Sequence, residues 1–582
     1  MTFKQLAVYL QKLEKTSSRI EITKILAELF KKSGDDEIDK IIYLLLGSLA
    51  PSYEGIVFNI AERMMLQVIN KTYGVDLDKV NKLYKEKGDL GEVAFALAQN
   101  QKSKIKNQKS NVSDVYIKLL EIAKDSGEDS VERKVNKTSE LLEKLDPLSA
   151  KFVVRIPVGK LRLGFSDKTI LDALSWLETG DKEKKEQLET AYNVLPDVGM
   201  LAKNVKKSGI DKAIKNVLPK VGTPILPALA QRLKSPKEMI EKMREVVVEP
   251  KFDGLRIQIH YKRAGFGKDA LVAELDSVKA YTRNLNENSW MFPELGDIGK
   301  QINADEVILD TEAIGVDEQR KTLANFQATM TRRRKHNIEK IASKVKIKFY
   351  VFDVLYRDGK NFMGLPYIKR RSELKKTVKK GSVLEVVNFI TTTDSKVIEK
   401  EMSKYLKDGL EGVIVKRADS KYVAGRTGWR WVKMKEKESA KAKLADTIDC
   451  VVMGYISGRG KRTQFGIGGF LAGIADGEKI KTLTKVGTGL TDDQFRELKR
   501  RLSELEVGEK PKEYGMVNKT LIPDVWVQPG LVVELAADEI TKSPIHSSGF
   551  ALRFPRLVKF RDDKKPTQAT TVSEIKKLFK LQ

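Results

Sequence analysis

The spacing of apolar residues changes once along the chain, near residue 220, and this change limits the folds that the chain can adopt. Up to about residue 215, apolar side chains recur at helical spacing and prolines are few, so the pattern predicts helices alone. Prolines and a glycine then cluster at 219–227, and beyond them apolar and polar residues alternate as they do in strands. We therefore expect an all-helical region followed by regions built on sheets.

Two segments of the first region show the helical spacing well. One helix is predicted to begin after Ser166, a good N-cap with Asp167 in the first turn, and to end at Gly180. A second helix is predicted to bury a face made of Val131, Val135, Leu142 and Leu145.

Strands are predicted in the second region from alternation and apolar runs. Residues 255–261 alternate strictly, with Leu255 on one face and Arg256 on the other. Residues 345–356 form a long strand that is mostly buried, and 413–415 form a short apolar strand. These strands predict a mixed α and β region with a substantial core.

The last part of the chain differs again. A charged stretch at 435–444 has the composition of a linker or hinge. Short strands with glycine-rich turns follow, interrupted by one helix at 491–505, and this pattern predicts a small barrel. We therefore expect a multidomain protein: an all-α domain at 1–218, an α+β domain with antiparallel sheets at 219–437, and a β-barrel domain at 438–582.

Charge gives the first indication of a partner. Lys and Arg number 107 against 80 Asp and Glu, a net charge of +27. Such an excess favours a polyanionic partner, nucleic acid before membrane, but it also fits a lysine-rich surface without a partner. Composition leaves these two interpretations open.

The cysteine content and the absence of targeting signals indicate the cellular compartment. Cys450 is the one cysteine, which excludes a disulfide framework and a cysteine-based zinc site, and its apolar surroundings predict an inert core residue. The first residues lack a secretory signal, and no apolar run is long enough for a bilayer. We expect a cytoplasmic protein without a membrane partner.

The strongest local signal is the stretch 249–256, which reads EPKFDGLR. Lys251 stands at a turn before the alternating strand, with Asp253 two residues later and Gly254 after it. This spacing fits an Asp-Gly structural turn or a covalent lysine nucleophile, and the stretch alone leaves both open. As a nucleophile Lys251 must be neutral, so its usual pKa of about 10.4 must be lowered by burial or by cations such as Arg256.

Five more short motifs follow Lys251 along the chain. They are 281–283 (YTR), 309–313 (LDTEA), 349–355 (FYVFDVL), 411–416 (EGVIVK) and 431–435 (WVKMK). Alternation places Asp310 and Glu312 on one strand face, where carboxylates suit a ribose hydroxyl or Mg²⁺. It places Lys433 and Lys435 together in the same way, ready for a phosphate. Each motif alone also fits an ordinary turn or a solvated strand.

In this order the six motifs resemble the nucleotidyl-transferase superfamily of DNA ligases, RNA ligases and mRNA capping enzymes. The run 552–564 (LRFPRLVKFRDDK) is similar to the last motif of ATP-dependent DNA ligases. Residues 162–169 and 223–230 resemble the helical DNA-binding domain and the start of the adenylation domain in archaeal and eukaryotic replicative ligases. The resemblance covers nearly the whole chain, and it identifies the family as ATP-dependent DNA ligases.

The resemblance implies roles for the residues of these motifs. Lys251 would be the catalytic residue that carries AMP, Glu249 would read the adenine amino group, and Phe352 would stack on the base. Glu312 and Glu411 would hold Mg²⁺. The other residues implied to bind the nucleotide are Arg256, Arg283, Lys416, Arg426, Lys433, Lys435, Arg561 and Lys564.

Among these cations the expected contacts differ. Arg283 would help to hold the AMP ribose and the nick phosphate, and Lys416 would contact a phosphate. Lys433 and Lys435 would face the α-phosphate. Arg561 and Lys564 would orient the leaving pyrophosphate, because phosphoryl-type transfer needs cations around the leaving group.

The resemblance also implies the domains and partners. The three domains would be a DNA-binding domain, an adenylation domain and an OB-fold, with ATP and Mg²⁺ as cofactors. The substrate would be nicked double-stranded DNA, and the use would be DNA replication, repair, recombination and cell division. A sliding clamp is an expected partner, although the sequence places no site for it, and we expect a monomer.

Three stretches depart from the family pattern or add to it. Arg426-Thr427 stands where many relatives have two adjacent arginines. Arg430 would be the substitute for the arginine contact that Thr427 cannot make. Residues 265–275 add a longer hairpin loop. The basic run 331–335 fits a DNA backbone contact and a solvated face equally well.

Enzymes with other functions also contain the lysine motif. An RNA ligase or a capping enzyme fits the long helical region and the C-terminal run less well. An NAD-dependent ligase would need a cysteine-rich zinc module, which one cysteine cannot build. A DNA-binding scaffold without activity would lack the nucleophile or a metal carboxylate, and Lys251, Glu312 and Glu411 are all present.

Overall fold

The computed structural model describes residues 1–581 apart from 101–109, 162, 216, 234, 268–275, 318–321, 324–345, 426–427 and 436–446. The chain divides into two compact units. Unit 1 comprises Met1–Ala61 with Lys106–Glu436, and unit 2 comprises Glu62–Ile105 with Lys437–Gln582. The linker expected at 435–444 and the basic run at 331–335 fall almost wholly outside the described residues, and the division into three domains stays a prediction.

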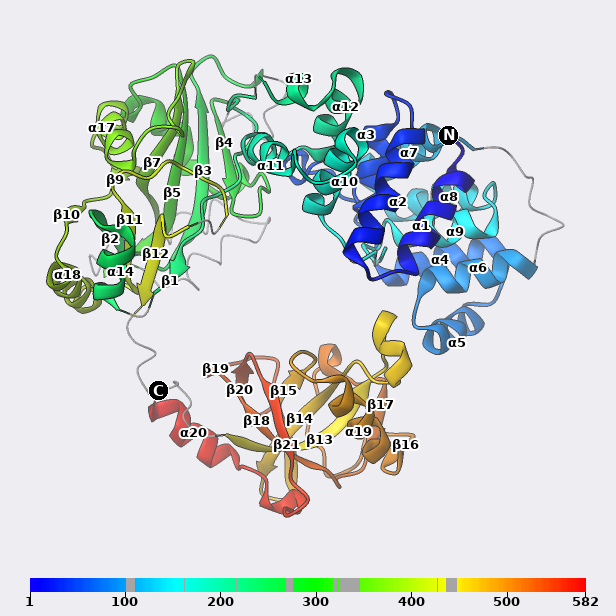
Figure 1. Ribbon diagram of the computed structural model, residues 1–582. Helices are drawn as coiled ribbons and strands as arrows, with labels where there is room; N and C mark the ends of the chain where they lie inside the picture. Colours follow the sequence, from blue (N-terminus) through cyan, green and yellow to red (C-terminus); the bar gives the residue numbers. More distant parts are fainter. Residues whose placement is uncertain are drawn as a thin grey trace. The chain divides into compact units, whose positions relative to one another are not determined.

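Helices fill the N-terminal part of the chain, as the periodicity predicts (Figure 1). In unit 1 they are α1 (Phe3–Glu14), α2 (Arg19–Lys32), α3 (Ile38–Leu45), α7 (Val112–Lys124), α8 (Ser130–Leu142), α9 (Pro147–Arg155), α10 (Asp167–Thr179), α11 (Lys185–Val194), α12 (Val198–Ser208) and α13 (Ile210–Ile214). In unit 2 they are α4 (Glu62–Tyr73), α5 (Leu77–Lys87) and α6 (Leu90–Asn100).

The bounds of α10 confirm the prediction from its caps. Ser166 is the N-cap with extended backbone, and Gly180 is the C-cap with a φ of 77°, a left-handed conformation that glycine adopts without strain. The buried face includes Ile170, Leu171 and Leu174. The cap residues and the apolar spacing are therefore enough to predict where this helix begins and ends.

The face predicted for α8 is partly wrong. Val131 is 56% exposed, whereas Leu142 is buried as expected. The buried face instead includes Lys134, whose ammonium donates to the Phe58 carbonyl at 2.8 Å. A lysine can lie on a buried face when its charged end finds a backbone acceptor, and apolar spacing does not register such a residue.

Two sheets form the rest of unit 1. The first has the order β1-β12-β11-β2-β10. Its strands are β1 (Gln231–Arg232), β2 (Val246–Lys251), β10 (Ile390–Thr392), β11 (Gly412–Arg417) and β12 (Trp431–Lys435). Helices α14 (Pro236–Met243) and α18 (Ser395–Lys407) bury its apolar side chains, among them Val246, Val248 and Val413.

The second sheet has the order β4-β3-β5-β7-β8, with β6 beside β5 and β9 beside β7. Its strands are β3 (Leu255–Lys262), β4 (Val278–Thr282), β5 (Glu306–Asp317), β6 (Thr322–Leu323), β7 (Lys346–Arg357), β8 (Lys360–Asn361) and β9 (Leu384–Val386). The long strands β5 and β7 lie side by side in Figure 1, and α17 (Tyr367–Thr377) packs on β7.

Both faces of β3 are buried, although its sequence alternates between apolar and polar residues. Gln258 is 7% exposed and His260 is fully buried. Gln258 exchanges hydrogen bonds with the backbone of Ile225, and His260 accepts one from the Gly222 amide at 3.0 Å. Polar residues of a strand can be buried when each finds a partner, so alternation alone did not predict that the proline-rich segment covers this face.

Unit 2 contains a C-terminal sheet of seven strands. They are β13 (Ile448–Ile456), β14 (Gly469–Asp476), β15 (Lys479–Val486), β16 (Glu506–Val507), β17 (Val525–Val527), β18 (Val532–Ala536) and β21 (Arg556–Phe560). A hairpin of β19 (Glu539–Lys542) and β20 (Phe550–Arg553) and the helices α19 (Asp492–Ser503) and α20 (Val572–Leu581) complete it. The helical, α+β and β-rich regions are confirmed, and among the described residues no pairing closes this sheet into a barrel.

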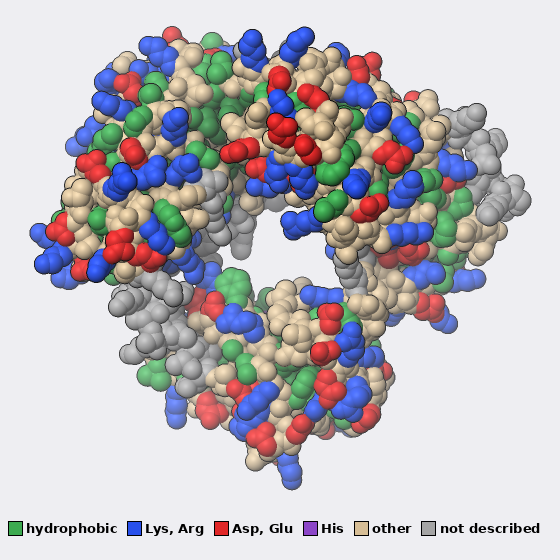
Figure 2. Space-filling view, in the orientation of Figure 1, with side chains coloured by type: hydrophobic (Ala, Val, Ile, Leu, Met, Phe, Trp, Pro, Cys, Tyr) green, Lys and Arg blue, Asp and Glu red, His purple; other side chains and the backbone are tan. Residues whose placement is uncertain are grey.

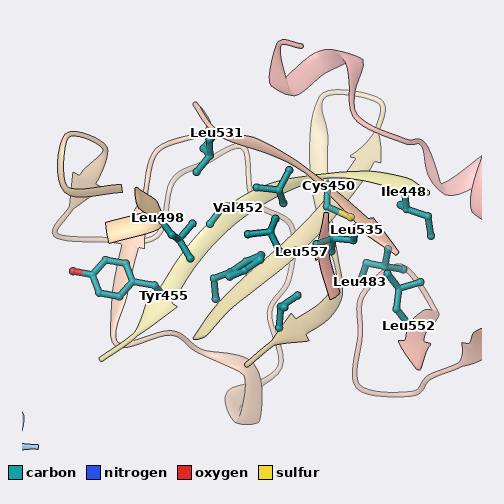
Figure 3. Packing of buried hydrophobic residues seen from close by; sticks show 14 of the residues in the cluster. Ile448, Cys450, Val452, Tyr455, Leu483, Leu498, Leu531, Leu535, Leu552 and Leu557 are labelled. Carbon is teal, nitrogen blue, oxygen red and sulfur yellow. The ribbon is translucent and has the colours of Figure 1, made fainter. Parts of the chain in front are cut away.

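Figure 3 shows the core of the C-terminal sheet, where Cys450 lies among leucine and valine side chains. Burial raises the pKa of the Cys450 thiol far above its usual range, which makes it unreactive. The prediction of an inert core cysteine agrees with this environment.

Charged residues are spread over the surface. In Figure 2 the Lys and Arg side chains are scattered over the visible face of both units, with Asp and Glu among them. None of the helices in the described part of the chain combines the length and the apolar character that a bilayer crossing requires. On this face, positive and negative side chains are therefore intermixed.

We predict that Arg370→Met lowers the free energy of unfolding of unit 1 by about 3–5 kcal/mol, because it leaves the carboxylate of Asp353 buried without its partner. Both side chains are fully buried, and the guanidinium donates twice to Asp353 at 2.9 Å. Urea unfolding followed by tryptophan fluorescence measures the change. Arg263→Met, which breaks an exposed pair with Asp305, is the control and should cost less than about 1 kcal/mol. Equal losses would contradict the prediction.

His260 is expected to make stability depend on pH. Burial, and secondarily the charge of Lys279, lowers its pKa to about 3. The unfolded chain takes up this proton near pH 6.5 and the folded chain only near pH 3, so this contribution to stability is lost as the pH falls below 6.5. Between pH 7 and pH 4.5 the unchanged protein should lose roughly 2 kcal/mol more than His260→Gln. If the unfolding free energies of the two proteins fall by the same amount between these pH values, His260 is not the group concerned.

Candidate active site

Three neighbouring strands bring Lys251 to an acidic partner and a second cation. In the register of β2, β11 and β12, Lys251 pairs with Gly412, and Gly412 pairs with Lys435. Glu411 immediately precedes Gly412, and its carboxylate forms ion pairs with the Lys251 ammonium and, at 3.0 Å, with the Lys435 ammonium. Lysine, carboxylate and lysine from segments far apart in the sequence therefore meet at one end of the sheet.

Two glycines of the predicted motifs are required by close backbone approaches. A Cβ on Gly412 would lie 2.3 Å from the Met434 carbonyl oxygen, and its φ of +139° is one that other residues rarely adopt. A Cβ on Gly254 would lie 2.6 Å from the Ala313 carbonyl oxygen. The glycines therefore let the turns that carry Lys251 and Glu411 pack tightly against β5 and β12.

A cavity of about 110 Å³ opens between the two sheets of unit 1. Residues from both sheets line it, and six of the thirteen residues predicted for the site are among them. The lining residues that belong to the predicted site are Glu249, Lys251, Arg256, Glu312, Phe352 and Lys416. The remaining wall is largely apolar and includes Ile414 and Trp431.

One end of this cavity is built around the carboxylate of Glu249, which is 2% exposed. The Lys416 ammonium lies 2.6 Å from it, and the Tyr367 hydroxyl donates a hydrogen bond to it. The Lys416 ammonium also lies 4.3 Å from the ring centroids of Phe352 and Trp431. A buried acid, a cation and aromatic rings at one place suit the flat, hydrogen-bonding edge of a base.

The position of Lys416 differs from the contact that the sequence pattern suggested for it. We expected this residue at a phosphate, and here its ammonium is held by Glu249. The register explains the position, because Ile414 pairs with Glu249 and Lys416 lies two residues farther along the same face of β11. A phosphate contact for Lys416 stays a prediction.

Another part of the wall is Arg256, which belongs to a network with Asp310 behind it. The guanidinium donates to both oxygens of Asp310 at 2.9 and 2.6 Å and also donates to the Ala228 carbonyl. The Tyr422 hydroxyl donates to the same carboxylate at 2.9 Å. Asp310 thus accepts three hydrogen bonds within the protein, and Glu312, the other acid on this face of β5, is the one that lines the cavity.

The pKa of Glu312 is raised to about 7, mainly because burial disfavours its charged form, while Arg256 and Lys251 partly offset this effect. Glu411 has a lowered pKa despite its burial, because Lys251 and Lys435 stabilise its charge. Two carboxylates with unlike environments thus lie at this site, Glu312 in the wall of the cavity and Glu411 beside the Lys251 ammonium. Magnesium is held in proteins by one or two carboxylates together with phosphate oxygens, so this donor set fits it. No group of three or more His, Cys, Asp or Glu suited to a metal occurs among the described residues.

Other predicted residues lie at the margin of the site. Lys433 pairs with Ile414 in the register, which puts it on the same sheet face as Glu249. Arg283 is exposed and borders a small hollow beside Arg256 and Asp310. Arg426 lies outside the described residues, so its contact stays a prediction.

Arg561 and Lys564 belong to unit 2. The Arg561 guanidinium donates to Asp449 at 2.9 and 3.1 Å and to Asp563 at 2.7 and 2.8 Å. The Lys564 ammonium donates to the same Asp449 at 2.6 Å. The structure thus brings the two cations together around one acid, and their contact with the leaving pyrophosphate stays a prediction.

Sequence reasoning missed Tyr367 and Tyr422. Each hydroxyl touches a carboxylate of the site, but neither belongs to a motif that alternation or spacing marks. Tyr367 follows Pro366 as the first residue of α17, and a helix start gave no reason to link it to a strand 118 residues away.

Two sheets with a cavity between them, a buried acid in its wall and a lysine paired with a carboxylate are the arrangement expected of a nucleotidyl transferase. Comparison with known proteins shows to which family within this class the chain belongs. Residues 2–175 match the family described as DNA ligase N terminus, 227–435 match ATP dependent DNA ligase domain, and 463–564 match ATP dependent DNA ligase C terminal region. The chain belongs to the family of ATP-dependent DNA ligases.

Relatives that match over the whole chain support the same family assignment. The chain is 40% identical to a probable DNA ligase of Dictyoglomus turgidum, over all of this chain and 98% of the relative. It is 36% identical to a DNA ligase of Caldivirga maquilingensis, again over all of this chain and 98% of the relative. A solved structure named Pmar-Lig_PreS3 has the same fold, with a TM-score of 0.54, 17% identity and coverage of 96% of this chain and 99% of that one.

We predict that Arg256→Lys raises the KM for ATP in the first half-reaction at least about tenfold, because a lysine ammonium cannot form the paired bonds to Asp310 and the bond to Ala228 together. Radiolabel transfer from α-labelled ATP to the protein, measured over a range of ATP concentrations, gives KM. Arg263→Lys, at an exposed site just after β3, is the matched control and should leave KM unchanged. A KM for Arg256→Lys that equals the control value would exclude a role in binding.

Proposed function

We propose that Lys251 is the residue on which this DNA ligase carries AMP while it seals nicked duplex DNA. The observation that supports the proposal most strongly is the shared cavity, which Lys251 lines together with the buried carboxylate of Glu249 and the ring of Phe352. A nucleotide whose base lies between Glu249 and Phe352 would direct its phosphates toward Lys251.

In the first step the neutral Lys251 amine attacks the α-phosphorus of ATP. The Nζ–P bond forms, the bond from the α-phosphorus to the bridging oxygen breaks, and pyrophosphate leaves while the amine loses its proton. Lys251 is paired with Glu411 in this structure. The amine therefore has to leave Glu411 and give up its proton before it can act as a nucleophile, and Lys435 is placed to take over the carboxylate.

The second and third steps use the stored AMP. The 5′-phosphate at a nick attacks the AMP phosphorus and releases the lysine, and the neighbouring 3′-hydroxyl then displaces AMP and closes the backbone. We propose Glu312 and Glu411 as the residues that hold Mg²⁺, which when bound would neutralise charge on the phosphates. Lys433 and Lys435 share the strand face of Lys251 and would hold the α-phosphate.

Arg561 and Lys564 are proposed to orient the departing pyrophosphate. Their shared contact with Asp449 supports the proposal, because it holds two flexible cations as one group. Contacts with DNA should be mainly to phosphates and to groove shape, since a ligase must seal nicks in any sequence. We further propose use in replication, repair, recombination and cell division, a sliding clamp as partner, and action as a monomer.

We predict that Lys251→Arg takes no label from α-labelled ATP and Mg²⁺, because an arginine side chain stays protonated and cannot attack phosphorus. Denaturing gels separate labelled protein from free nucleotide. Lys242→Arg, on the exposed side of α14, is the control and should take label like the unchanged protein.

Sealing of a nick by pre-adenylated DNA tests whether the later steps survive, and nicked RNA tests the substrate class. Label on Lys251→Arg at the level of the unchanged protein would refute the assignment of the nucleophile. Faster sealing of nicked RNA than of nicked DNA would contradict the proposed substrate.

A further inference from the structure

Tyr367 joins the two sheets of unit 1 at the base end of the cavity. It is the first residue of α17 and is fully buried. Its hydroxyl donates to the Glu249 carboxylate on β2 and lies 2.8 Å from the Phe352 carbonyl oxygen on β7. One side chain therefore sets the position of the acid on one sheet relative to the backbone that carries the stacking ring on the other.

The partners of Glu249 leave room for a substrate. Tyr367 bonds to Oε1, which also lies 3.8 Å from the Arg371 guanidinium nitrogen in an ion pair too long for a hydrogen bond, and the Lys416 ammonium lies 2.6 Å from Oε2. A carboxylate has about four acceptor positions, so roughly two remain. Both oxygens are thus held in place by the protein, yet each can still accept a hydrogen bond from an amino group in the cavity.

Tyr367 and Lys416 also hold each other. The ammonium donates to the tyrosine hydroxyl at 2.9 Å. Burial, and then the negative charge of Glu249, raises the pKa of Tyr367 well above its usual value, so the hydroxyl keeps its proton. It therefore remains a donor to the carboxylate at neutral pH.

We propose that Tyr367 determines the specificity for nucleotides with a 6-aminopurine base by positioning Glu249. The carboxylate accepts a hydrogen bond from the 6-amino group, and it disfavours a base that has no donor there or has a carbonyl oxygen instead. The hydroxyl of Tyr367 holds the carboxylate at the height of the ring stacked on Phe352, so that stacking and hydrogen bonding occur together. This inference rests on the proposed function, in which ATP is the nucleotide that reacts with Lys251.

The test is Tyr367→Phe, which keeps the ring beside Trp431 and removes only the hydroxyl. Transfer of the nucleotide to the protein is measured with ATP and with purine riboside triphosphate, which lacks the 6-amino group. We expect kcat/KM for ATP to fall about tenfold through KM, as for the loss of one hydrogen bond to a charged group. The rate at saturating ATP and the kcat/KM for the analogue should stay the same. The preference for ATP over the analogue would then fall about tenfold.

Two further variants distinguish positioning from a general loss of structure. Tyr422→Phe removes the other buried hydroxyl beside Trp431, which bonds to Asp310 instead of Glu249, and it should keep the preference for ATP. Glu249→Gln should lower the preference, and adding Tyr367→Phe to it should lower the preference no further, because the two residues act on the same contact.

The outcomes separate this inference from the proposed function. Equal losses for ATP and the analogue in Tyr367→Phe, or an undiminished preference for ATP in Glu249→Gln, would overturn the role of Tyr367 while labelling of the unchanged protein continues. No label on the unchanged protein from ATP would overturn the proposed function and this inference together.

Discussion

The register between β2 and β11 is the constraint on which the site depends. It sets Lys251 opposite Gly412, which puts the Glu411 carboxylate against the lysine, and it sets Glu249 opposite Ile414. Successive residues of a strand face opposite sides, so a shift of one residue would turn Lys251 and Glu249 away from the cavity together. The two ends of the cavity are therefore positioned by one set of backbone hydrogen bonds.

Three buried ion pairs hold the part of unit 1 around this cavity. Glu249 with Lys416, Arg256 with Asp310, and Arg370 with Asp353 are each mostly or fully buried. Removing one partner of such a pair leaves a buried charge without compensation, which is costly. Each pair thus favours one arrangement of its side chains, which is how buried polar networks specify a single packing.

The site was predicted from sequence to the extent that its members lie in short motifs. Glu249, Lys251 and Arg256 stand within eight residues of one another, and the structure brings all three to one cavity. The prediction for Lys416 did not identify Glu249 as its partner, because alternation gives the face of a strand and not the neighbour that this face meets. Tyr367 was missed because it belongs to a helix start whose distance from Glu249 no local pattern reports.

The sequence by itself determined the order of helices and strands, the nucleophile motif and the family, because these depend on residue types at short spacing. It did not determine which charges would be satisfied inside the protein. Lys251 and Glu411 are 160 residues apart, and the Tyr367 hydroxyl reaches Glu249 across two sheets. The register of β11 beside β2 decided the first partner, and the placement of Tyr367 between the two sheets decided the second, since contact between distant segments follows from how they meet in space and not from spacing along the chain.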